Sequence, residues 1–153
     1  MTQQAAIDHI LTHCRTVAVV GLSPKVHRAS YEVSAYMQAH GWRIIPVNPV
    51  VAQRAVGGAA GDNTILGERV YATLTEAATV ETIDLVDVFR NSDDVPPVVD
   101  EAIAIGAPAI WLQLGIVNDA ACDKARAAGM QVVQDKCLLV EHRRHPRAAM
   151  NES

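Results

Sequence analysis

Basic and hydroxyl side chains gather in one short segment, directly after an apolar run that ends in glycine. Gly21 follows the run at residues 16–20, and Ser23, Lys25 and Arg28 come within the next seven positions. Glycine permits a tight turn, the hydroxyl and the two cations bind anions, and the helix expected to follow presents its positive dipole end. The segment therefore predicts a phosphate-binding loop, with an ordinary loop carrying solvated basic side chains as the alternative.

The sequence departs from the dinucleotide-binding fingerprint at two points. Only the first glycine of G-x-G-x-x-G is present, at Gly21, and residues 46–49 (PVNP), at the end of the second expected strand, include no acid for the ribose of NAD. A ribose that carries its own phosphate fits better, because it requires positive charge. Coenzyme A (CoA) has a 3′-phosphate and NADP a 2′-phosphate, so the residues alone allow either ligand, with Lys25, Arg28 and Arg54 as candidate partners.

Two further strand ends supply candidate ligand contacts. Phe89 and Arg90 lie at the end of the third expected strand, and Gln113, Leu114 and Gly115 lie at the end of the fourth. Arginine binds phosphate, and an amide beside exposed backbone suits a neutral polar group such as the pantetheine amides. The alternatives are core packing for Phe89, a surface ion pair for Arg90, and a strand that simply stops at Gly115.

Short apolar runs alternate with helical patterns along the whole chain. The expected strands are 16–21, 44–47, 84–89, 109–114 and 131–133. Glycines 41, 106 and 129 each end a helical pattern shortly before the next strand, and Asn118 is a plausible helix N-cap. The pattern predicts one α/β Rossmann-like domain over 1–153, with a mainly parallel sheet of about five strands and helices on both faces. We also expect an N-terminal helix within 1–15, a mobile loop at 52–64 and a frayed tail at 146–153.

Composition narrows the classes of partner. Of 153 residues 50% are hydrophobic, and the net charge of −4 with dispersed acids argues against nucleic acid. We see neither a signal peptide nor a membrane-spanning run, and three widely spaced cysteines are typical of free thiols, so we expect a cytoplasmic protein. His9 and His13 share a helix face without a third ligand nearby, so no metal site is expected.

Five motifs in order resemble those of the stand-alone CoA-binding proteins (YccU-like), which are similar to the N-terminal CoA-binding domain of the succinyl-CoA synthetase α subunit. They are VAVVGLS at 17–23, IPVNP at 45–49, ILGERVY at 65–71, WLQLG at 111–115 and DKC at 135–137. The resemblance implies a Rossmann-like fold that holds CoA at the strand ends. The stretch 52–64 is longer than the usual link between the second and third motifs. The synthetase carries its phosphorylated histidine in a following domain that we do not expect here, so synthetase chemistry is not transferred.

Residues and resemblance together give one candidate site. It comprises Gly21, Leu22, Ser23, Lys25, Arg28, Asn48, Pro49, Phe89, Arg90, Gln113, Leu114, Gly115 and Cys137. Cys137 follows the last strand and Lys136, so its thiolate could form a mixed disulfide with the CoA thiol, whereas a small buried side chain is the alternative. The predicted function is non-catalytic binding of CoA or acyl-CoA. The alternatives are an NADP-dependent or thioester-processing enzyme and a subunit that docks on a ligase.

Overall fold

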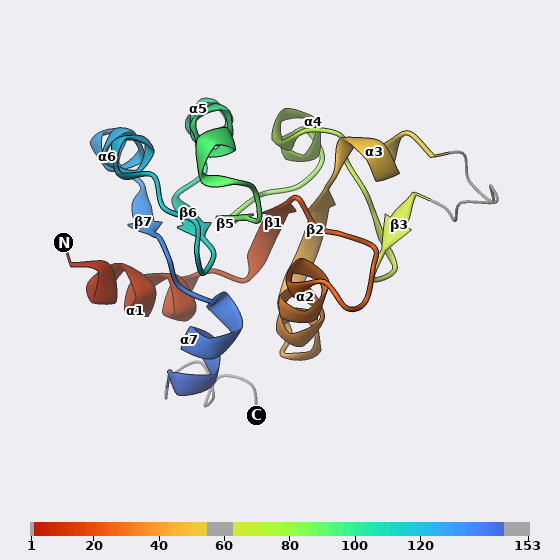
Figure 1. The fold of residues 1–153 in the computed structure, drawn as a ribbon, viewed down its shortest axis with the longest axis horizontal. Helices are drawn as coiled ribbons and strands as arrows, with labels where there is room; N and C mark the ends of the chain where they lie inside the picture. The colour runs from red at the N-terminus through yellow and green to blue at the C-terminus, as the bar shows by residue number, and fades with distance from the viewer. Residues whose placement is uncertain (1, 55–62, 146–153) are drawn as a thin grey trace.

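The computed structural model describes residues 2–54 and 63–145, in which five parallel strands form one central sheet (Figure 1). The strands are β1 (Thr16–Val20), β2 (Arg43–Val47), β5 (Leu85–Val88), β6 (Ala109–Leu112) and β7 (Gln131–Val133). Their order is β2-β1-β5-β6-β7, and every neighbouring pair is parallel. Because both faces of such a sheet are covered, its strands consist mainly of apolar residues. The predicted fold class is confirmed.

Helices cover the two faces of the sheet and bury a core on each. On one face lie α1 (Gln3–His13), α2 (Ala29–Ala39) and α7 (Leu138–Arg144); on the other lie α4 (Leu74–Ala78), α5 (Val95–Ala104) and α6 (Asp119–Ala127) (Figure 1). Alternation along β1 serves both cores, since Val17 and Val19 face the first and Ala18 the second.

The expected helix signals are confirmed, and several expected boundaries are wrong by a few residues. Glycines 41, 106 and 129 have positive φ just after α2, α5 and α6, and the Asn118 side chain accepts a hydrogen bond from the Ala121 amide. The N-terminal helix, expected within 1–15, covers Gln3–His13. Strands β5 and β6 end at Val88 and Leu112, which is earlier than expected, so the polar residues that follow already belong to the loops.

Some elements had no clear periodic signal. They are α3 (Pro49–Ala52), the 3₁₀ turn η1 (Ser92–Asp94), α4, α7, and a small antiparallel hairpin of β3 (Thr64–Ile65) and β4 (Glu68–Arg69). The expected loop at 52–64 is wrong at its ends, because Ala52 belongs to α3 and Thr64 to β3. Its centre at 55–62, and the tail at 146–153, lie outside the described residues.

The three thiols are free, as expected, and differ in burial. Cys14 and Cys122 are buried, whereas Cys137 is half-buried. Burial is the main reason that the pKa of Cys14 rises to about 12, with the Asp84 carboxylate adding to it. None of the helices in the described part of the chain is long and apolar enough to cross a membrane.

Candidate functional site

A cleft opens where the chain order of the sheet reverses, between the ends of β1 and β5. Ligands of open parallel sheets bind in the crevice outside the strand ends at this point. The cleft has a volume of about 650 Å³. Its lining residues are Gly21, Ser23, Lys25, Arg28, Ala29, Ser30, Phe89, Arg90, Asn91, Ser92, Gly115 and Ile116. The segments that follow β1, β5 and β6 therefore contribute to one cleft.

Gly21 lets the turns after β1 and β5 approach each other closely. Its φ is +89°, a backbone conformation that other residues rarely adopt, and its amide donates to the Val47 carbonyl at 3.0 Å. A β-carbon at this position would lie 2.3 Å from the carbonyl oxygen of Phe89. The glycine expected from the sequence is therefore required both for its φ and for the contact between the two turns.

Side-chain hydroxyls hold the segment between β1 and α2 in place. The Ser23 amide donates to Ser30 Oγ at 3.0 Å, and the Lys25 amide donates to Ser23 Oγ at 3.1 Å. Arg28 precedes the first residue of α2 and gives the helix no side-chain cap, so the positive end of the helix dipole faces the cleft without a capping oxygen from this residue. Ser23 and Ser30 thus order the loop through backbone amides, and neither hydrogen bond uses the side chain of Lys25 or Arg28.

The charge in this cleft has one sign. Lys25, Arg28 and Arg90 line it, and no aspartate or glutamate is among its described lining residues. Within residues 2–54 and 63–145, none of the three cations lies within ion-pair distance of a carboxylate, and the ion pair considered for Arg90 is not formed. Such an arrangement attracts a ligand with several negative charges.

A second cleft of about 350 Å³ adjoins the first and shares Gly21, Lys25, Phe89 and Arg90 with it. Its remaining lining residues are Pro24, Asn48, Pro49, Val50, Val51 and Arg54. The Asn48 carboxamide oxygen accepts from the amides of Val50 and Val51, at 3.0 and 3.2 Å, and so caps α3. Its nitrogen donates to the carbonyl of Leu22 at 3.0 Å, so Asn48 ties the end of β2 to the loop after β1.

Gln113 is turned into the core and away from the cleft. It is 3% exposed; its nitrogen donates to Asp87 Oδ1 at 2.7 Å, and its oxygen accepts from the Leu138 amide at 3.4 Å. Asp87 lies in the middle of β5, where burial raises the pKa of its carboxyl to about 7, opposed in part by hydrogen bonds from Gln113 and the Val88 backbone. Sequence reasoning missed Asp87, although a lone acid within an apolar strand was a visible signal.

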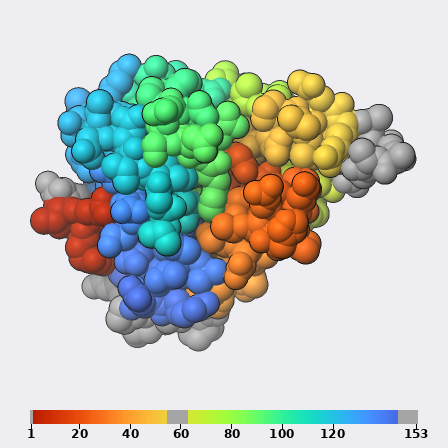
Figure 2. All heavy atoms as spheres, in the orientation of Figure 1, coloured from red at the N-terminus to blue at the C-terminus, as the bar shows by residue number. Residues whose placement is uncertain are grey.

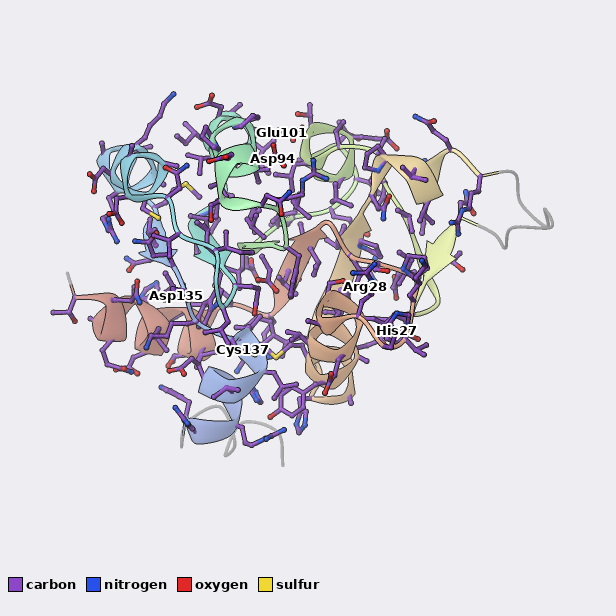
Figure 3. The ribbon with its side chains drawn as sticks, viewed as in Figure 1. His27, Arg28, Asp94, Glu101, Asp135 and Cys137 are labelled. Carbon is purple, nitrogen blue, oxygen red and sulfur yellow. The ribbon has the colours of Figure 1, made fainter. Side chains whose placement is uncertain are left out.

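The clefts bring together nine of the expected site residues. Gly21, Ser23, Lys25, Arg28, Asn48, Pro49, Phe89, Arg90 and Gly115 line one cleft or both. Leu22 and Gln113 are buried, Leu114 is exposed, and Cys137 lies at the beginning of α7, apart from Arg28 (Figure 3). Their roles as ligand contacts stay predictions.

Several residues that line the larger cleft were not predicted from the sequence. In the larger cleft, the missed residues each lie within a few residues of a strand end or at the start of a helix; they are Ala29, Ser30, Asn91, Ser92 and Ile116. No group of three or more metal-ligating side chains occurs among the residues that the structure describes.

A parallel sheet with a cationic cleft at its switch point and a glycine turn after β1 defines a Rossmann-like α/β domain. Residues 15–143 match the model of the CoA binding domain family, and the chain belongs to this family. It is 37% identical to the Bacillus subtilis (strain 168) protein YneT over 139 residues, which are 91% of this chain and 93% of YneT.

Solved structures share the fold. A protein from Pyrococcus horikoshii OT3 has a TM-score of 0.80 and 31% identity, with 95% of this chain and 92% of that chain covered. The dinucleotide-forming acetyl-coenzyme A synthetase 1 of Ca. Korarchaeum cryptofilum has a TM-score of 0.66 at 17% identity, with 83% of this chain and 27% of the synthetase chain covered. The second likeness shows the fold alone.

Proposed function

We propose that this chain binds CoA or an acyl thioester of CoA in the two adjoining clefts and catalyses no reaction on it. The cationic lining, with Lys25, Arg28 and Arg90 and no described acid, is the observation that carries the proposal. CoA combines a diphosphate with a 3′-phosphate, which matches several cations spread over neighbouring loops. Membership of the CoA binding domain family supports the same ligand.

We propose that the segment between β1 and α2 binds the phosphates of CoA. Ser23 and Ser30 order the loop of this segment. The segment ends at the N-terminus of α2, an eleven-residue helix that has no side-chain cap. Asn48 and Pro49 would border the nucleoside part through the second cleft. Cys137 lies outside both linings, so the proposal gives its thiol no contact with CoA.

Isothermal titration calorimetry tests the ligand. We expect CoA to bind far more tightly than AMP, which lacks the diphosphate and the pantetheine, and equal millimolar affinities for both would overturn the proposal. A thermal-shift comparison of NAD, NADP and CoA distinguishes CoA binding from the NADP-dependent enzyme, because a bound ligand raises the apparent stability of the protein. Stabilisation by NADP without stabilisation by CoA would favour a reductase.

Charge reversal at Lys25 locates the phosphates. If Lys25 holds the 3′-phosphate, Lys25→Glu weakens the binding of CoA much more than the binding of dephospho-CoA. If Lys25 holds the diphosphate, the binding of both ligands weakens equally. Lys124→Glu makes the same change of charge on α6, where Lys124 pairs with Asp100 outside the cleft lining. The control variant should leave both affinities unchanged.

A further inference from the structure

Large apolar side chains are exposed on the loop between β6 and α6, at the edge of the proposed CoA site. Leu114 is 70% exposed and Val117 is 44% exposed. Gly115 and Ile116, between them, line the larger cleft. The loop is uncharged from 114 to 118, so it continues the cleft as an apolar surface. Contiguous exposed apolar residues beside a ligand cleft indicate an interaction site.

Hydrogen bonds from neighbouring loops hold this apolar surface in place. The Gly115 amide donates to Asp135 Oδ1 at 2.7 Å, and the Val117 amide donates to Ser92 Oγ at 3.1 Å. The Asn118 side chain donates to the Ser92 carbonyl at 3.1 Å. Leu114 and Val117 are therefore presented to solvent by a fixed backbone, which lowers the entropic cost of binding an apolar group there.

Charge and apolarity are separated along the ligand edge of the sheet. In the order β2-β1-β5-β6, Arg54, then Lys25 and Arg28, then Arg90 follow the first three strands, and the apolar loop follows the fourth. Figure 2 shows the green segment after β5 between the orange segment after β1 and the cyan β6–α6 loop. Phosphates attracted to the cations would leave the other end of a CoA molecule over the apolar loop.

Resting on the proposed CoA binding, we propose that residues 114–117 hold the acyl chain of a CoA thioester. The ligand class is then an acyl-CoA with an aliphatic chain, in preference to free CoA. Leu114 and Val117 offer a small open surface beside Ile116, which is partly buried against the core, and this surface suits a short chain that lies along the loop with one side in solvent.

Calorimetry with free CoA, acetyl-CoA, butyryl-CoA and hexanoyl-CoA tests the preference. A fully buried methylene strengthens binding roughly fourfold, so a chain covered on one side should gain about twofold for each methylene. The double variant Leu114→Ser/Val117→Ser should abolish this gain, so that it binds the three thioesters no more tightly than it binds free CoA. Val80→Ser removes a valine that is 64% exposed between α4 and β5, outside both cleft linings, and should keep the gain.

The outcomes separate the two proposals. If free CoA and all three thioesters fail to bind, the proposed function itself is wrong. If free CoA binds and the thioesters bind no more tightly, only the acyl site is wrong. A gain with chain length that survives in the double variant overturns the acyl site. Light scattering supplies a further outcome. If the wild type is a dimer, the double variant is a monomer and the thioesters show no gain, the apolar loop is a dimer contact and the acyl site is wrong.

Discussion

The turn at Gly21 lies so close to the turn after β5 that a β-carbon at Gly21 would clash with the Phe89 carbonyl. We expect Gly21→Ala to lower the free energy of unfolding by about 2–4 kcal/mol, because it combines a strained positive φ with a steric clash. Gly41→Ala is the matched control: its φ is +87°, and nothing lies within 4 Å of its β-carbon position. It should cost only about 1 kcal/mol of strain.

Urea unfolding measures the free energy of unfolding of both glycine variants, and calorimetry measures the affinity of each folded variant for CoA. Only Gly21→Ala should also weaken CoA, since separating the turns after β1 and β5 widens the cleft that both line. Equal losses of stability in Gly21→Ala and Gly41→Ala would mean that the Phe89 contact relaxes without cost.

The buried carboxyl of Asp87 makes stability depend on pH in a defined direction. Its pKa rises to about 7 in the folded state from 3.8, so both states hold the proton below pH 3.8, and only the unfolded state releases it between pH 4 and 7. The contribution of Asp87 to stability is therefore complete below pH 4 and is lost as pH rises to about 7. Asp87→Asn keeps an oxygen for the Gln113 donor and removes the titration.

Chemical unfolding at pH 4.5, 6 and 8 gives the comparison. We expect the free energy of unfolding of Asp87→Asn, relative to wild type, to increase steadily over this range and to become constant above pH 7, with a total change of a few kcal/mol. A difference between the two proteins that is independent of pH would show that Asp87 is ionised throughout.

At the scale of the elements, Asn48 connects β2, α3 and the loop after β1. Asn48→Ala removes the cap of α3 and the bond to the Leu22 carbonyl, so it should cost about 1–2 kcal/mol and also weaken CoA severalfold. Thr73→Ala removes the cap of α4, where the threonine hydroxyl accepts from the Glu76 amide, away from both clefts. It should cost similar stability and leave the CoA affinity unchanged. If both variants bind CoA like wild type, Asn48 does not position the loop.

Apolar periodicity predicted the strands and long helices because burial on both faces of a parallel sheet dictates residue type. It missed α3 and α4, since four or five residues contain too few turns to show a period. The cations of the cleft were predictable because strand ends meet at one edge. The direction of Gln113 was not, because an amide serves a buried carboxylate and a ligand equally well, and only tertiary packing decides between them.

At the scale of the whole molecule, global and local charge act on CoA with opposite sign. The net charge of −4 repels an anionic ligand, whereas the lining of the larger cleft contributes Lys25, Arg28 and Arg90. Salt screens both effects, with a Debye length of about 10 Å at 0.1 M. If the global charge dominates, salt strengthens binding; if the cleft dominates, salt weakens it.

We expect the cleft to dominate, because Lys25, Arg28 and Arg90 line the cleft in which we propose that CoA binds, and no described acid lines it. Raising the salt concentration from 50 to 500 mM should lower the affinity for CoA by about tenfold. The affinity for AMP should fall by less, since AMP carries a single phosphate. Arg90→Gln should flatten the dependence for CoA, and Lys124→Gln, on α6 outside the cleft lining, should not. An affinity for CoA that rises with salt would mean that these three cations do not hold its phosphates.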